Sequence, residues 1–227
     1  MRHRDLCHLT AVIIVLLITW GISINSFDAQ EKAKQFLRFF DVEIEPTTTA
    51  PLPKCSLSKV CPPEHFALRV QSGAANIIGP KICFEGRIIM SHVLNNVGPG
   101  LNIVVVNGAN GVVEKYGSLN IQRGLKSDMV NLTEIKPGRI VLTASFDDVT
   151  PKMTTEVREA FVRMGSTLIM SVKRRDNWVF AGTTGTKIKS LFEKRAINDE
   201  KTNIYEGWPE VVEVGGCFPR IQTDELT

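Results

Sequence analysis

The sequence predicts an α+β (mixed α/β) fold with at least one partly antiparallel sheet. Short apolar segments rich in Val, Ile and Phe recur along the chain, separated by Gly, Pro and Asn, which is typical of strands and turns. Few segments have the spacing of an amphipathic helix, and these do not alternate strictly with the strands. Hydrophobic residues make up 43% of the 227 residues and charged residues 22%, so most of the chain can bury a core.

Residues 1–25 predict entry into the secretory pathway. MRHRDLCHLT is basic, the next fourteen residues are apolar or small, and the polar SFDAQEKAK follows. This order is typical of a signal peptide. The apolar run is shorter than the ~20 residues that comfortably span a bilayer. We therefore expect a cleaved signal peptide, with a short signal-anchor of the Golgi type as the alternative.

Residues 26–54 predict a linker. The segment is polar and uneven, and Pro46, Pro51 and Pro53 interrupt regular structure around a run of threonines. A short helix over EKAKQFLRFF is less favoured than a spacer. The folded domain is therefore expected to occupy residues 55–227.

The first half of this domain predicts strands joined by tight turns. The segment LNIVVVNG is β-branched and continuous, as expected for a buried strand, and NGANG after it indicates a hairpin. The predicted strands of this half lie in residues 65–73, 76–86, 87–93, 101–108 and 112–121.

The second half mixes strands and helices. In MTTEVREAFVRMG the apolar residues Val157, Ala160, Phe161 and Met164 follow helical spacing, with a threonine at the start and Gly165 at the end. The other expected elements are short helices in residues 127–138 and 189–197 and strands in residues 138–148, 174–185 and 210–216.

The cysteines predict two disulfides. Cys7 lies in the leader, and the four others enter an oxidising lumen, where three connectivities are open. A metal site built on Cys55, Cys61 and the nearby histidines His65 and His92 is disfavoured, since the C-x5-C spacing lacks a second close pair. Asn131 begins the chain's N-x-[ST] sequon and is a candidate glycosylation site.

Several function classes lack support in the sequence. The net charge of +3 is spread along the chain, unlike the basic stripe of proteins that bind nucleic acid. The adjacent carboxylates Asp147 and Asp148 suit a turn better than a catalytic pair, because neighbouring strand residues face opposite ways. No G-x-S-x-G elbow is present. We expect no catalysis, cofactor or metal.

The densest polar and aromatic cluster is Arg174–Trp178. A tryptophan ring can stack on a sugar while Arg175, Asp176 and Asn177 bind hydroxyls, so Trp178 and these three residues are candidate contacts for a carbohydrate or partner. A buried Trp178 covered by an Arg–Asp pair is the alternative, and the residue types alone favour it.

Five ordered segments resemble one family, the secreted cytokine-like proteins that include pancreatic-derived factor and the interleukin-like epithelial–mesenchymal transition inducer (family with sequence similarity 3). The segments are CPPEHFALRVQSGAANIIGPKICFEGRIIM, NNVGPGLNIVVVNGANG, SFDD, RDNWVFAG and NIYEGWPEVVEVGGC. They run from about Cys55 to Pro219, which is nearly all of the predicted domain.

The resemblance implies a compact β-β-α domain of two sheets flanked by short helices, stapled by disulfides Cys55–Cys83 and Cys61–Cys217. Chain entropy would give these loops about 3.5 and about 5 kcal/mol. One member has a further cysteine after the WVF motif, where Ala181 stands here, so a disulfide dimer through this position is not available.

Together these observations predict a secreted protein with cytokine activity that acts through an extracellular receptor or partner, as a monomer or a non-covalent oligomer. Membrane contact is expected only if the leader is retained. Similar domains occur in glycan-processing proteins, so a lectin-like carbohydrate-binding module of the secretory pathway or Golgi is the alternative hypothesis.

Overall fold

The computed structural model describes residues 13, 14, 16, 17, 52–119, 132, 135–186 and 188–221. The chain divides into two units, Met1–Ala50 and Pro51–Thr227, and the elements below belong to the second. Almost all of the predicted leader and linker, most of the predicted helix in residues 127–138, and the sequon at Asn131 lie outside the described residues. Among the residues described, no helix is long and apolar enough to cross a membrane.

Two antiparallel sheets form the domain. The four-stranded sheet has the order β3-β2-β1-β9 and the five-stranded sheet the order β5-β4-β6-β7-β8. The strands are β1 (His65–Gln71), β2 (Lys81–Phe84), β3 (Arg87–Ser91), β4 (Gly100–Asn107), β5 (Val113–Ser118), β6 (Arg139–Phe146), β7 (Asn177–Thr183), β8 (Phe192–Ala196) and β9 (Glu213–Pro219).

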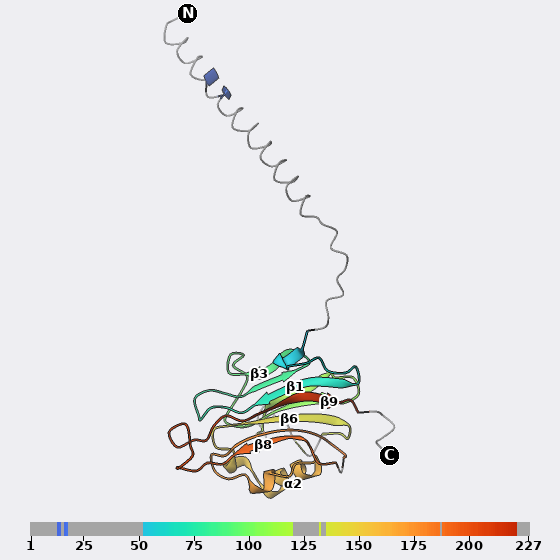
Figure 1. Cartoon of the computed structure of the whole chain (residues 1–227), viewed down its shortest axis with the longest axis vertical. Helices are drawn as coiled ribbons and strands as arrows, with labels where there is room; N and C mark the ends of the chain where they lie inside the picture. The colour runs from blue at the N-terminus through green and yellow to red at the C-terminus, as the bar shows by residue number, and fades with distance from the viewer. Residues whose placement is uncertain are drawn as a thin grey trace, which may run out of the picture. The chain divides into compact units, whose positions relative to one another are not determined.

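The sheets and a helix form three layers, with β1, β3 and β9 in one layer, β6 and β8 in the next and α2 (Thr155–Arg163) beyond them (Figure 1). One apolar cluster lies between the two sheets, with Phe66, Leu68 and Leu142 among its members. A second lies between the five-stranded sheet and α2, with Phe161 and Trp178 among its members. The predicted α+β fold and its β-β-α order are therefore confirmed.

The middle layer explains why the apolar run LNIVVVN does not alternate. Val104 and Val106 of β4 face the cluster between the sheets, whereas Ile103 and Val105 face the cluster under α2. A strand covered on both faces can carry apolar residues at successive positions. β6 is likewise buried from Ile140 through Phe146, with Thr143 and Ser145 as its buried polar residues.

Helix α2 has the ends that its sequence predicts. The Oγ1 of Thr154 accepts a hydrogen bond from the backbone N–H of Val157, and Gly165 has a φ of 97°, in the left-handed region where glycine is favoured. The side chains of Ala160 and Phe161 are buried against the five-stranded sheet. The apolar face predicted for this helix therefore covers the sheet.

One predicted helix is wrong. Residues 189–197 contain strand β8, and the described part of residues 52–221 contains the α-helix α2 together with the 3-10 turns η1 (Lys54–Ser56), η3 (Thr150–Lys152) and η4 (Ile169–Ser171). The segment KSLFEKRAI consists largely of good helix formers, yet its backbone pairs with β7 from Phe192 to Ala196. Pairing with a buried neighbour outweighs a helix propensity of a few tenths of a kcal/mol per residue, which is about the size of the differences between ordinary residues.

Candidate functional site

The structure anchors the segment that opens the domain to strands on both sides of β1. Cys55 is bonded to Cys83 of β2, at a sequence separation of 28, and Cys61 is bonded to Cys217 of β9, at a separation of 156. Both β2 and β9 pair with β1. This pairing is the one that the family resemblance implies, and it ties the two ends of the domain together.

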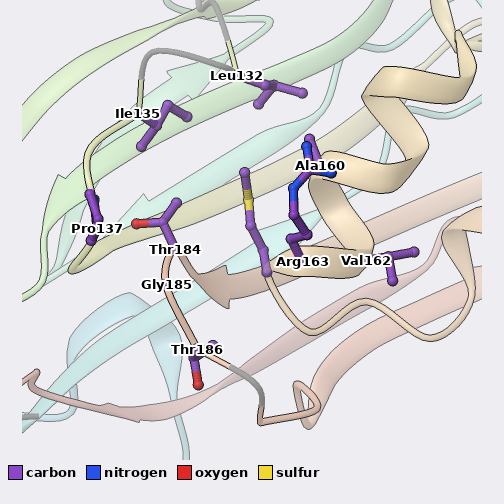
Figure 2. Close-up of a pocket in the computed structure, with 10 residues that line it drawn as sticks. Leu132, Ile135, Pro137, Ala160, Val162, Arg163, Thr184, Gly185 and Thr186 are labelled. Carbon is purple, nitrogen blue, oxygen red and sulfur yellow. The ribbon is translucent and has the colours of Figure 1, made fainter. Parts of the chain in front are cut away.

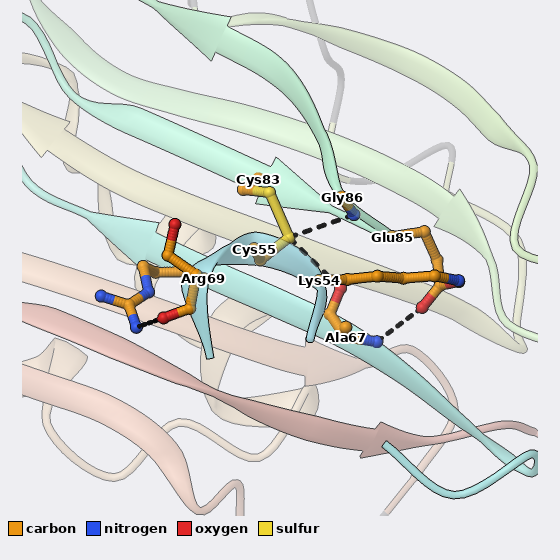
Figure 3. The surroundings of a disulfide bond; sticks show 8 residues. Lys54, Cys55, Ala67, Arg69, Cys83, Glu85 and Gly86 are labelled. Atoms are coloured by element: carbon orange, nitrogen blue, oxygen red, sulfur yellow. Dashed lines mark hydrogen bonds and ion pairs between the residues drawn. A yellow bond between two sulfur atoms is a disulfide. The ribbon is translucent and has the colours of Figure 1, made fainter. Parts of the chain in front are cut away.

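Polar contacts hold the turn that carries Cys55 against the sheet (Figure 3). Lys54 forms an ion pair with Glu85, and Glu85 Oε1 accepts a hydrogen bond of 2.7 Å from the backbone N–H of Ala67. Arg69 donates a hydrogen bond of 2.6 Å to the carbonyl oxygen of Ser56. The role of this segment is therefore structural. In the described ranges no three His, Cys, Asp or Glu residues are grouped so that they could hold a metal ion.

The structure buries Trp178, which the sequence offered as a sugar or partner contact. The residue is 0% exposed, and its ring lies 5.1 Å from that of Phe161 and 5.5 Å from that of Phe180, measured between centroids. Its Nε1 donates a hydrogen bond of 2.9 Å to the carboxylate of Glu193. Trp178 therefore has no free face for a pyranose, and the assignment of this ring as a contact is corrected.

Asp176 and Asn177 are also buried, with 1% and 2% of their surface exposed. The Asp176 carboxylate accepts hydrogen bonds from the backbone N–H groups of Lys173 (2.9 Å) and Asn198 (2.8 Å). The amide of Asn177 donates to the carbonyl oxygen of Glu210 at 2.7 Å. These two side chains therefore organise the loops that meet at the start of β7, and they are not available as contacts.

Arg175 is the one candidate of this group that keeps part of its surface. Its guanidinium carbon lies 4.8 Å from the centre of the Trp208 ring, and Trp208 is 8% exposed. A cation over an aromatic face gives a favourable electrostatic contact. The tryptophan that Arg175 covers is thus distant in sequence, which residue types could not reveal.

The adjacent carboxylates Asp147 and Asp148 form a turn. The Oδ1 of Asp148 accepts hydrogen bonds from the backbone N–H and the hydroxyl of Thr150, at 3.0 and 2.7 Å. The Oδ1 of Asp147 accepts from the backbone N–H of Asp148. Both side chains therefore hold the loop that follows β6, as expected for turn formers.

An open hollow of about 680 Å³ lies between the C-terminal end of α2 and the turns at Pro137 and Gly185 (Figure 2). Apolar side chains, including Leu132, Ile135 and Met164, supply most of its wall. Its most buried hydroxyl belongs to Thr184, which accepts from Arg139 N–H and donates to a backbone oxygen. Among the described residues that line the hollow, no acidic side chain or histidine accompanies this hydroxyl.

A group of exposed apolar side chains lies at the other end of β6. We define the two-turn tip as residues 74–78 and 92–95, which carry Ile77, Ile78, Val93 and Leu94. These side chains are 73%, 56%, 92% and 52% exposed. The sequence predicts strands over residues 76–86 and 87–93, but β2 begins only at Lys81 and β3 ends at Ser91, so these aliphatic residues lie in turns. The available signal was a pair of aliphatic residues inside each turn, in NIIGPK and SHVLNN.

The domain is a disulfide-linked α+β domain with two antiparallel sheets, and its similarity to known proteins identifies the family. Residues 99–186 match the family model described as interleukin-like EMT inducer. Protein FAM3C of Rattus norvegicus is 41% identical over 226 residues, covering 98% of this chain and all of the relative. Protein FAM3D of Mus musculus is 41% identical over 221 residues, covering 97% and 99%. Protein FAM3A of Pongo abelii is 39% identical over 228 residues, covering 98% and 99%. The chain belongs to the FAM3 family.

Ala181, where the resemblance places a further cysteine in one family member, is fully buried. It lies on β7 opposite Leu142 of β6 and belongs to the cluster between the sheets. In this chain the position therefore contributes to the core.

Proposed function

We propose that this chain is a secreted, cytokine-like signalling protein that acts through an extracellular partner and not through catalysis. The observation that carries the proposal is the similarity, over nearly its whole length, to FAM3 relatives, together with the matched interleukin-like EMT inducer model. A cytokine-like role fits the description of the matched family model, interleukin-like EMT inducer. The receptor-directed action is the part that we propose.

Two further features support secretion. The basic and apolar start of the chain is typical of a signal peptide. The two disulfides are of a kind that forms and persists in oxidising compartments, and both join distant parts of the chain. A domain stabilised in this way is suited to the extracellular environment.

The test uses the full chain expressed in mammalian cells. We expect protein in the medium with a mature N-terminus near residue 25, found by N-terminal sequencing. Purified protein is then added to epithelial cells, because the family model names an effect on epithelium. We expect saturable surface binding and a dose-dependent change in phosphorylated signalling proteins, compared with material purified from cells carrying the empty vector. Retention of all protein in the cell, or no binding and no response, would overturn the proposal.

A further inference from the structure

We propose that the two-turn tip is the surface through which this protein binds its partner, and that the partner is an extracellular protein with an apolar concave surface. The inference rests on the proposed function, because it assigns a surface to the partner that signalling requires. It is carried by three properties of the tip: its exposure, its fixed shape and its lack of charge.

The exposure of the tip is unusual in its arrangement. Single exposed apolar residues are common on soluble proteins, whereas contiguous groups mark interaction sites. Here the two turns are carried by neighbouring segments: a methyl group placed on Gly79, the residue after the first turn, would lie 2.5 Å from Cγ2 of Val97 and 3.5 Å from Cβ of His92 in the second turn. Ile77, Ile78, Val93 and Leu94 are therefore exposed on segments that lie close to each other.

Internal hydrogen bonds fix the first turn. The backbone N–H of Ala74 donates to the carbonyl oxygen of Ile78 at 2.8 Å, and Ala74 oxygen accepts from Ile77 and Ile78. Gly73 N–H donates to the carbonyl oxygen of Ser145 at 2.8 Å, which attaches the turn to β6. The aliphatic side chains are thus held outward by a turn whose backbone polar groups bond to one another.

Two side chains fix the second turn. The Oδ1 of Asn96 accepts from the backbone N–H of Ser91 at 3.0 Å, and its Nδ2 donates to the carbonyl oxygen of Ile89 at 2.8 Å. The Oγ of Ser91 accepts from the backbone N–H of Leu94 at 3.2 Å. Since both turns already have their shape, a partner that binds them does not have to order them, which lowers the entropic cost of binding.

The composition of the tip favours a protein partner over a lipid surface. Neither turn contains an acidic or basic residue other than His92, and the nearest charge in sequence is Lys81. The cores of protein interfaces are depleted in charge and surrounded by polar residues, here Asn76, Asn95 and Asn96. Binding to an anionic bilayer gains about 1 kcal/mol per basic residue, so stable attachment needs a basic cluster that these turns lack.

The chain offers matched controls at the opposite end of the five-stranded sheet. Ile188 is 77% exposed and Leu191 is 93% exposed, close to the values of Ile77 and Val93. They lie in the connection between β7 and β8, beside the start of β6, whereas the tip adjoins the end of β6. A difference in cell binding between variants of the two pairs therefore reflects their position on the domain and not the exposure of an aliphatic side chain.

The experiment measures binding of the fluorescently labelled full-length secreted protein to intact epithelial cells. We expect Ile77→Asp and Val93→Asp to raise the half-saturating concentration at least tenfold and to lower signalling in parallel. Ile188→Asp and Leu191→Asp should leave both within twofold of the unaltered protein. All four variants change exposed side chains, and thermal unfolding verifies that each remains folded.

Three further measurements distinguish a protein on the cell surface from a lipid surface and from a second copy of this chain. Trypsin treatment of the cells should abolish binding, vesicles of phosphatidylcholine and phosphatidylserine should not bind, and sedimentation velocity should show no self-association through the tip. Vesicle binding or self-association that the two tip variants abolish would overturn the proposal that the tip binds a separate extracellular protein. Unchanged cell binding by both tip variants would overturn the inference and leave the proposed function standing. Absence of any binding or response by the unaltered protein would remove both.

Discussion

Trp178 and the two-turn tip have opposite relations between residue type and exposure. Trp178 stands in a polar sequence, RDNWVF, yet it is 0% exposed and packs between Phe161 and Phe180. The tip stands in two unremarkable turns, yet Val93 is 92% exposed. The polar segment RDNWVF thus supplies a core side chain, whereas the aliphatic residues of the tip lie at the surface.

Strand register and hydrogen bonding explain this difference. β7 lies inside the five-stranded sheet, so the residues of its two faces enter the two apolar clusters, whatever residues precede the strand. The side chains of Asp176 and Asn177 bond to backbone groups of their own loop and of two other segments, at Asn198 and Glu210. In the tip, backbone groups bond to one another in the first turn and to the Ser91 side chain in the second, and the aliphatic side chains stay exposed. Strand pairing and hydrogen bonding therefore decide which side chains are exposed in these two regions.

The largest expected effect tests the buried member of this comparison. Trp178→Ala should lower the free energy of unfolding by about 3–5 kcal/mol, because it removes a large side chain that the core cannot refill. Urea denaturation measures this loss. Val93→Ala is the contrast at the tip and should change the same free energy by less than about 0.5 kcal/mol, as for exposed substitutions. Comparable losses for the two variants would contradict the assignment of core and surface.

The next effect concerns the carboxylate that holds Trp178. Glu193 accepts hydrogen bonds from Nε1 of Trp178 at 2.9 Å, from the backbone N–H of Thr167 at 2.7 Å and from Ser166 Oγ. Glu193→Gln replaces one acceptor by a donor and leaves buried donors unpaired, which should cost about 2 kcal/mol. Denaturant unfolding followed by tryptophan fluorescence reports the change. Lys194→Gln, exposed on the same strand, should cost little, and equal losses would show that Glu193 has no such role.

Much of the fold could be predicted from the sequence because local patterns agree with the final packing. The buried strand in residues 101–108 and the amphipathic helix ending at Gly165 follow from apolar spacing and turn residues. The segment 189–197 could not be predicted, since β8 is specified by pairing with β7 across the sheet and not by its own composition. Local propensity says nothing about such long-range pairing.

The site residues were less predictable. The four cysteines follow from their count and compartment, but three connectivities satisfy that count, and only a family resemblance selects one of them. The burial of Trp178, which the residue types favoured, follows from the place of β7 inside the five-stranded sheet, where both of its faces are covered. The exposure of Ile77 and Val93 depends on where β2 begins and β3 ends, which the apolar residues of these segments do not reveal.

A smaller effect tests the shape of the tip. Asn96→Ala removes both side-chain hydrogen bonds that brace the second turn, so we expect a loss of about 1 kcal/mol in the free energy of unfolding. Cell binding should weaken severalfold because Val93 and Leu94 lose their fixed positions. Asn76→Ala removes an exposed amide from the first turn and serves as the control. A stability loss for Asn96→Ala with unchanged binding would show that the partner does not need the shape of this turn.

The smallest expected effect is a gain in stability within the layer that buries Trp178. Thr143 is 0% exposed, and within the described structure its hydroxyl has no hydrogen-bond partner. It lies on β6 between Ile103 and Phe180, under α2. Thr143→Val replaces the unpaired hydroxyl by a methyl group and should raise the free energy of unfolding by up to about 1 kcal/mol.

Ser145 supplies the matched contrast on the same strand. Its Oγ accepts a hydrogen bond of 2.8 Å from the backbone N–H of Trp178, so Ser145→Ala should lower the free energy of unfolding by about 1–2 kcal/mol by leaving that donor unpaired. Thermal and urea unfolding of both variants measure whether each change raises or lowers the free energy of unfolding. If Thr143→Val lowered the free energy of unfolding, the hydroxyl of Thr143 would have a hydrogen-bond partner. The buried polar side chains of this layer would then be hydrogen-bonded, like Asp176 and Asn177 before Trp178.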